Sequence, residues 1–192
     1  MVTDVSCNAG DDGQINITIS GGYSPYTFSW FNSTMIPILI GLPTVNTTDS
    51  LENLLADDYI LQITDNNNCT LIDTISVNEP NPLSLITSTI PASCNGYSDG
   101  QLNVLVSGGT PNYSYSWNTI PVQNNANAVF VPAGTYLLTV TDNNNCSDTI
   151  SETVLEPLSV PVSIISSSTT VCIGGSINLQ ATGALSYSWS PS

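Results

Sequence analysis

The sequence has no lysine, arginine or histidine, so its 15 aspartates and glutamates give a formal net charge of −15. Nucleic acids are bound through cations that displace phosphate counterions, and anionic membranes attract the same cations. Both partners are therefore excluded. Most acid–base and nucleophilic catalysis also needs histidine, lysine or a cysteine that one of them activates. We therefore expect that the protein is not an enzyme.

Long hydrophobic runs are also missing. The longest, residues 35–43, is broken by Pro37 and Gly41 and is too short to span a bilayer. The first residues have neither a basic region nor an apolar core, so no signal peptide is visible, and we expect an exported protein to contain this chain as an internal fragment. The hydrophobic fraction of 41% nevertheless exceeds that of disordered chains.

The sequence consists of repeats. Residues 7–22 recur as residues 94–109, an offset of 87, and residues 59–69 recur as residues 136–146, an offset of 77. The first copy therefore carries ten extra residues between these motifs. A third copy starts at Cys172 and is cut short. Since half a sandwich cannot close a core, we expect the native chain to continue.

Prolines separate the copies, and proline cannot donate to a strand ladder. They are Pro80, Pro82, Pro157 and Pro161. We predict two complete modules, residues 1–81 and 82–159, and the start of a third, residues 160–192.

Apolar and polar residues alternate over short runs bounded by Gly, Asn and Asp. This period of two predicts antiparallel strands with one buried face. In the first copy we predict strands over residues 14–20, 26–30, 50–54, 59–65 and 71–77. Strands at this spacing predict an all-β fold of tandem immunoglobulin-like β-sandwich modules.

Several aromatic residues occupy positions that this fold uses in its core. Trp30 fits the core tryptophan of strand C, while Tyr59 and Tyr136 fit the tyrosine corner that opens strand F. Ligand platforms are the alternative, but the inward phase favours the core. The apolar insertion at residues 35–40 exceeds what one small core needs, so we expect an extra strand or a contact with a neighbouring module or chain.

These motifs resemble the SprB-type repeat of gliding-motility and cell-surface adhesins of bacteria. Its pattern is Cys-Asn-Gly-x-x-Asp-Gly, an alternating strand, Gly-Gly, Pro-Tyr-x-x-x-Trp, then Gly-x-Tyr, Asp-x-x-x-Cys and a closing Glu-Pro. Two copies fit across residues 5–160. The first departs from the pattern with Asp57 where the second has Gly134, and with its insertion. The third copy resembles a related immunoglobulin- or PKD-like repeat.

The resemblance implies a large extracellular protein at the bacterial cell surface, exported by type IX secretion. Its partners are then neighbouring repeats of the same protein or other copies in a filament, and its repeats are spacers without catalytic residues. We expect a stalk that presents a distal adhesive region. The alternative is a module that binds surface polysaccharide, which a flat exposed row of Tyr23, Tyr97 and Trp189 would favour.

Three segments resemble the Asp-Ser/Thr-apolar acceptor that receives O-glycans in bacteria carrying this repeat family. They predict glycosylation of Ser50, Thr74 and Thr149. Chance occurrence of a three-residue motif is the alternative.

No cofactor is expected. Six acidic residues are candidate Ca²⁺ ligands: Asp11, Asp12, Asp57, Asp58, Asp65 and Asp142. Turn chemistry is the favoured interpretation, since Asp and Asn bond their own backbone in tight turns and no 12-residue loop of alternating acids is present. A pair of glycosidase carboxylates is disfavoured because the acids fall in loops of both copies.

Five cysteines at repeat-equivalent positions predict structural disulfides, because a zinc site without histidine needs four clustered cysteines. Cys7 precedes strand B and Cys69 follows strand F, which places them at opposite ends of a sandwich, about 23 Å apart. A disulfide needs Cα atoms within about 7 Å. The next module presents its F–G turn to Cys7, so we predict a bridge to Cys146. The same rule pairs Cys69, Cys94 and Cys172 with modules outside this chain.

Overall fold

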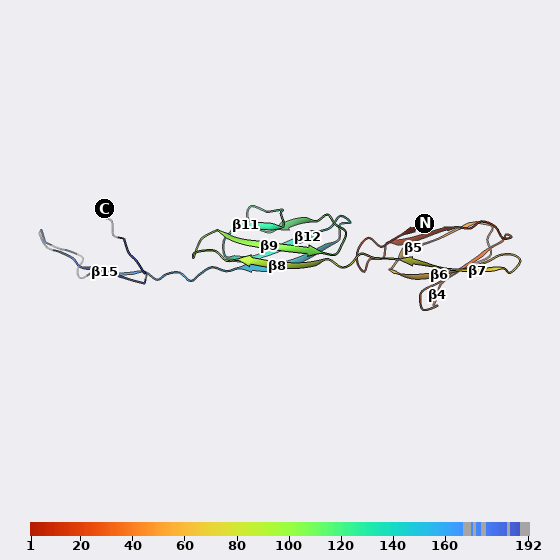
Figure 1. The fold of residues 1–192 in the computed structure, drawn as a ribbon, viewed down its shortest axis with the longest axis horizontal. Coiled ribbons are helices and arrows are strands. Elements are labelled where there is room, and N and C mark those ends of the chain that lie inside the picture. Colours follow the sequence, from red (N-terminus) through yellow and green to blue (C-terminus); the bar gives the residue numbers. More distant parts are fainter. Residues whose placement is uncertain (167–169, 171, 174–175, 184, 189–192) are drawn as a thin grey trace.

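The structure, a computed structural model, describes residues 1–166, 170, 172–173, 176–183 and 185–188. Two β-sandwich modules follow one another along the long axis of the molecule, and a two-stranded ribbon lies beyond them (Figure 1). All the regular elements among the described residues are strands, and the fold is all-β. The described residues include no helix that could cross a membrane.

The first module packs two sheets face to face. Its strands are β1 (Val2–Thr3), β2 (Gly13–Thr18), β3 (Thr27–Phe31), β4 (Pro37–Ile40), β5 (Thr48–Leu54), β6 (Asp57–Thr64) and β7 (Thr70–Val77). One sheet has the order β1-β2-β5 and the other β4-β3-β6-β7. This is the A-B-E and C′-C-F-G arrangement of an immunoglobulin-like sandwich, as the alternation predicts.

The second module repeats this arrangement without the C′ strand. Its strands are β8 (Ser84–Ile90), β9 (Gly100–Ser107), β10 (Ser114–Trp117), β11 (Asn127–Val131), β12 (Gly134–Thr141) and β13 (Ser147–Val154). The sheet orders are β11-β9-β8 and β10-β12-β13. In the third segment β14 (Ser163–Ser166) pairs with β15 (Leu179–Thr182).

Each module has its own hydrophobic core, centred on a tryptophan. Trp30 and Trp117 are fully buried in separate clusters of apolar side chains. The indole N–H of Trp30 donates to Asp49 Oδ2 at 2.8 Å, and that of Trp117 donates to Asn125 O at 3.0 Å. The N–H group of each indole therefore has a hydrogen-bond acceptor inside its core. The core interpretation of Trp30 is confirmed.

Two tyrosine corners fasten the start of strand F. The Tyr59 hydroxyl donates to Leu55 O at 3.0 Å, and the Tyr136 hydroxyl donates to Pro132 O at 2.8 Å. In both, the acceptor lies four residues upstream, as expected for this motif. Burial raises the pKa of both phenols, with the Asp57 charge adding to the effect at Tyr59.

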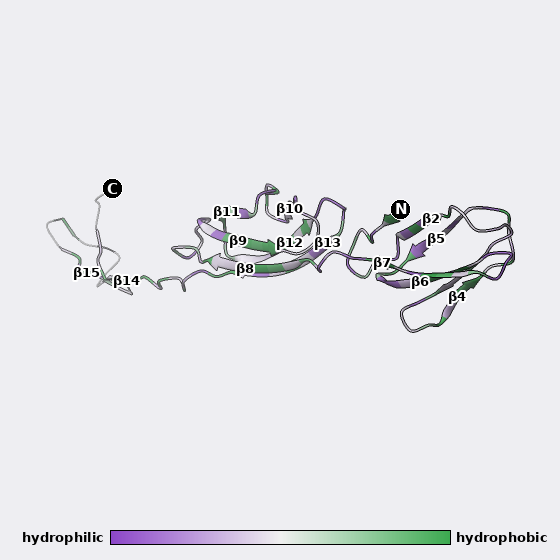
Figure 2. Cartoon of the chain, turned by 45° about the vertical axis from the view of Figure 1, so that its right-hand side comes forward, coloured by the Kyte–Doolittle hydropathy of each residue, from purple (hydrophilic) through white to green (hydrophobic). Residues whose placement is uncertain are grey.

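The insertion of the first copy forms the predicted extra strand. Strand β4 pairs with β3 at the edge of its sheet, with Leu39 opposite Trp30. All four of its residues are exposed, and Figure 2 shows the strand as a hydrophobic segment at the margin of the module. In the second module a single bridge between Trp117 and Gln123 stands at this edge.

Candidate functional site: the junction between the first two modules

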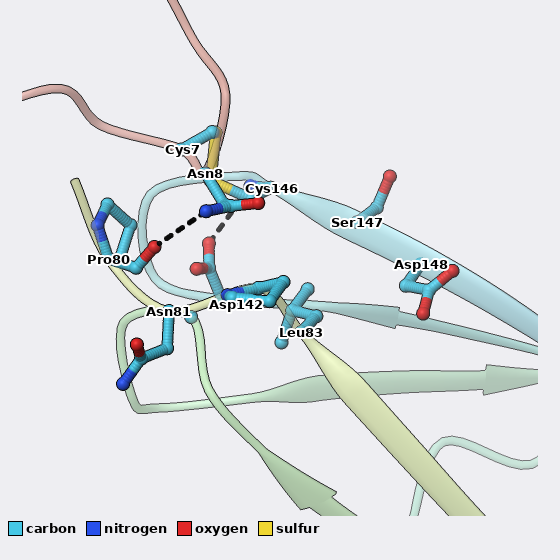
Figure 3. Close-up of a pocket in the computed structure, with 11 residues that line it drawn as sticks. Cys7, Asn8, Pro80, Asn81, Leu83, Asp142, Cys146, Ser147 and Asp148 are labelled. Carbon is cyan, nitrogen blue, oxygen red and sulfur yellow. Dashed lines mark hydrogen bonds between the residues drawn. A yellow bond between two sulfur atoms is a disulfide. The ribbon is translucent and has the colours of Figure 1, made fainter. Parts of the chain in front are cut away.

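The A–B loop of the first module meets the F–G turn of the second. A disulfide joins Cys7, which precedes β2, to Cys146, which precedes β13, with their Cα atoms 5.7 Å apart (Figure 3). This is the pairing that strand polarity predicts, and it links residues 139 positions apart. Beside it, Asn144 Nδ2 donates to Ser6 O at 2.9 Å. The two modules are thus joined by a covalent bridge and a hydrogen bond in addition to the chain itself.

The carboxylate of Asp142 shapes the turn that presents Cys146. Its Oδ1 accepts from the backbone N–H of Asn144 and of Cys146, each at 2.9 Å. Its Oδ2 accepts from the Thr110 N–H at 2.7 Å. Burial alone raises the pKa of Asp142, but these three backbone donors outweigh it and leave the pKa below its ordinary value. The side chain therefore acts as a fixed anionic template for the turn.

Asp65 has the same role in the first module. It accepts from the N–H groups of Cys69 and Asn67 at 2.9 Å and of Tyr23 at 3.1 Å. The N–H of Cys69 is the main cause of a pKa below the ordinary range. The turn interpretation of Asp65 and Asp142 is therefore supported.

Other acids that were candidate Ca²⁺ ligands also accept local backbone donors. Asp12 Oδ1 accepts from the Ser6 N–H at 2.9 Å, and Asp57 Oδ1 accepts from the Asp58 N–H at 2.8 Å. Within the part of the chain that the structure describes, no three His, Cys, Asp or Glu side chains gather as a metal site.

A glutamate clamps the chain as it leaves each module. Glu79 Oε1 accepts from Asn8 Nδ2 at 2.9 Å, and Glu79 Oε2 accepts from the Ala9 N–H at 2.5 Å. Asn8 Nδ2 also donates to Pro80 O at 3.2 Å. The loop that carries the bridging cysteine thus also holds the exit of its own module. Sequence reasoning missed this role, although the repeated Asn after Cys and the closing Glu-Pro are its signal.

The clamp is repeated in the second module. Glu156 accepts from Asn95 Nδ2 at 2.8 Å and from the Gly96 N–H at 2.6 Å, and Asn95 Nδ2 reaches Pro157 O at 3.3 Å. The same contacts recur in both copies, so the clamp is a feature of the repeat.

The linker between the modules runs against the Gly-Gly motif of the second. The Gly109 N–H donates to Asn81 O at 2.8 Å. A Cβ on Gly108 would overlap the carbonyl of Pro82, and one on Gly109 would lie 2.8 Å from Leu83 Cδ2. Figure 3 shows the cleft beside the bridge, about 380 Å³ in volume, between this linker and Asp142. The motif therefore lets the linker pass close to the turn that carries the bridge.

The three remaining cysteines are exposed and unpaired in this chain. Cys69 lies in the F–G turn of the first module, as Cys146 does in the second, while Cys94 lies in the A–B loop of the second. Cys172 is at the equivalent position of the third segment. Their pairing with modules outside this chain stays a prediction.

The three predicted glycosylation sites are all exposed and lie on strands at sheet edges. Ser50 is on β5, Thr74 on β7 and Thr149 on β13. Their positions leave the hydroxyl groups open to a modifying enzyme, and glycosylation stays a prediction.

The exposed tyrosines do not form a row. Tyr23 is 67% exposed in the B–C loop of the first module, and Tyr97 is 59% exposed in the A–B loop of the second. These loops lie at opposite ends of the two-module body, because the A–B loop of the first module is at the junction. Trp189 lies outside the described residues.

Comparison with known proteins gives one family match. The family model described as SprB repeat matches residues 1–35 and 86–122, which confirms the resemblance seen in the motifs. No curated protein matches the chain at a significant level.

Several solved structures are similar in their chain trace. The two immunoglobulin domains of DIP-gamma share 11% identity, with 81% of this chain and 94% of that chain covered and a TM-score of 0.44. A C-terminal intimin fragment, solved with the intimin-binding domain of its translocated receptor, shares 12% identity, with coverage of 87% and 67% and a TM-score of 0.42. The fibronectin(III)-like modules of Clostridium thermocellum CbhA share 12%, with coverage of 81% and 95% and a TM-score of 0.33.

Proposed function

From the two SprB-type repeats that the chain contains, we propose that it is a non-catalytic stalk segment of a large, secreted bacterial surface adhesin. The stalk holds a distal adhesive region away from the cell, and its partners are the neighbouring repeats. Export by type IX secretion and glycans on Ser50, Thr74 and Thr149 belong to the same proposal. Short polar glycans there would add to a surface whose only side-chain charges are carboxylates.

The observation that carries this proposal is the double attachment at the junction. The chain itself connects the modules, and the bridge from Cys7 to Cys146 connects them a second time. Two covalent connections at separate points restrict bending and twisting far more than one flexible linker does. A spacer benefits from such stiffness, whereas a catalytic site would need convergent side chains.

Nuclear magnetic relaxation of the full chain tests the proposed stiffness. If the junction is rigid, amide ¹⁵N relaxation in both modules fits one shared, elongated diffusion tensor. Reduction of the bridge then separates the tumbling of the two modules. Independent tumbling of the modules in the oxidised protein contradicts the stalk.

Polysaccharide binding is the second candidate function, and the observation that favours it is Phe130. This side chain is 78% exposed beside a cleft lined by Ile120, Pro121 and Tyr136. Exposed aromatic and apolar groups of this kind can stack on the apolar face of a sugar. Titration of the protein with surface polysaccharide tests it: binding shifts the resonances of Phe130 and of Tyr136 in the same cleft, and Phe130→Asn abolishes the Tyr136 shift. The stalk proposal expects no shift.

A further inference from the structure

The bridge between Cys7 and Cys146 closes a loop that contains most of both modules. Strands β2 to β12 lie between the two cysteines in sequence, and so do both core tryptophans, Trp30 and Trp117. Of the strands in the two modules, β1 and β13 lie outside it. A pull on the two ends of the chain therefore has a covalent route that bypasses both cores.

We propose that this bridge makes the two-module unit inextensible, so that tension along the stalk passes through the disulfide and β13 rather than through the two cores. The inference rests on the proposed stalk function for its biological meaning. Its physical content concerns this chain alone. Force follows the shortest covalent path, and here that path leaves the first module at Cys7, enters the second at Cys146 and continues along β13.

Strand β13 is suited to carry tension because it has almost no slack. An antiparallel strand rises about 3.4 Å per residue, and a fully extended chain reaches at most about 3.6 Å. All eight residues of Ser147–Val154 pair with β12 in unbroken register. Even complete detachment of this strand would therefore lengthen the path only slightly.

Hydrogen bonds fasten the path at its far end. Leu155 O accepts from the Ala92 N–H at 2.9 Å, and the clamp of Asn95 holds Glu156 and the carbonyl of Pro157. The extended segment from Cys146 to Pro157 is therefore held along its length by strand pairing and at its end by hydrogen bonds. In the first module the path is the short segment before Cys7, which pairs with β2 and is held by the bond from the Val5 N–H to Asn78 O at 2.8 Å.

Loss of the bridge changes the mechanics qualitatively. The sandwiches then lie in series with the load, and their unfolding frees all the residues between the two cysteines. A separation of 139 residues corresponds to about 480 Å of extended chain. With the bridge intact, the Cα atoms of the same two residues stay 5.7 Å apart.

Single-molecule force extension of the full chain, held by fused tags at its two ends, tests the proposal. The variant Cys69→Ser/Cys94→Ser/Cys172→Ser retains only the bridging pair, and the matched control adds Cys7→Ser to it. The oxidised bridged chain is expected to reach a total contour length about 480 Å shorter than either the same chain after reduction or the control. The third segment extends equally in all of them and cancels in the difference.

Two outcomes overturn the proposal. Equal contour lengths mean that no bypass exists. A Cys7–Cys69 bridge would hold only the first module, and in a chain that retains Cys69 it would shorten the contour by about 210 Å. The test is separate from that of the stalk. If the oxidised modules tumble as one body but the chain extends to its full contour length, the bypass is wrong and the stalk proposal is unaffected. If the oxidised chain has the short contour length but its modules tumble independently, the stalk proposal is wrong and the bypass is unaffected.

Discussion

Phe130 occupies in the second module the position that Asn53 occupies in the first, and both have a left-handed backbone, with φ values of 57° and 56°. The strand ladder shifts register here, between Val129 and Val131 in the second module. Asparagine tolerates positive φ, but a bulky aromatic residue does so only under strain. The second copy therefore retains a backbone bulge that its own residue does not favour.

Phe130→Asn is expected to stabilise the second module by about 1 kcal/mol, since it relieves this strain and Phe130 is 78% exposed. Denaturant midpoints at constant m-value measure the change. The reverse substitution, Asn53→Phe, is the matched control and should destabilise the first module by a similar amount. A loss of stability in Phe130→Asn would show that the ring packs in solution and would contradict the strain argument.

Gly108 and Gly21 offer a second matched pair. Both have positive φ, so alanine at either should cost about 1 kcal/mol through the backbone alone. An added Cβ on Gly21 meets nothing within 4 Å, whereas one on Gly108 overlaps the linker at Pro82. Thermal unfolding should therefore show a clearly larger loss for Gly108→Ala, together with altered amide shifts in the linker. Equal losses for the two variants would mean that the linker does not pack there.

Removal of the exit clamp should weaken the first module. In Glu79→Ala, Asn8 Nδ2 and the Ala9 N–H lose the carboxylate that accepts their hydrogen bonds, which should cost about 1 kcal/mol. Hydrogen exchange of the Ala9 amide reports this directly and should accelerate. Glu156→Ala should accelerate exchange of Gly96 in the same way. Unchanged protection of Ala9 would exclude the clamp.

Acid should destabilise both modules through their turn aspartates. Hydrogen bonds hold the pKa of Asp65 and Asp142 below the ordinary value. Their contribution to the free energy of unfolding is therefore fully present at pH values above the ordinary pKa, and it is lost as the pH falls through the folded-state pKa. Because the chain has no basic side chain, acid leaves almost no charge on it, and repulsion between cations cannot cause the loss. Stability measured from pH 6 down to 2 should fall at the acid end, and less steeply in Asp65→Asn/Asp142→Asn. A rise in stability with acid would contradict this account.

Much of the fold follows from the sequence because its signals are periodic. Alternation predicts the strands to within a few residues, and the phase of Trp30 and Tyr59 predicts their burial. Strand polarity alone favours Cys146 over Cys69 as the partner of Cys7, since it decides at which end of a sandwich each loop lies.

The remaining features depend on contacts that have no period. The role of Glu79 cannot be predicted from the periodicity of the sequence, because its contact with Asn8 joins residues 71 positions apart that only the fold brings together. The strain at Phe130 arises from a bulge in the ladder, which alternation does not reveal. The composition of the insertion predicts an extra strand. The residues of this strand are nevertheless exposed, because it lies at the edge of a sheet and Trp30 already fills the core against which that sheet packs.

The pairing of Cys7 with Cys146 is the central claim, and disulfide mapping of the intact oxidised chain tests it most directly. Trypsin finds no site in a chain without lysine and arginine, so digestion at acidic and aromatic residues is required. Mass spectrometry without reduction should detect a fragment that links the segment around Cys7 to the segment around Cys146 and separates on reduction. A fragment that links Cys7 to Cys69 would contradict the inter-module bridge and the tension path built on it.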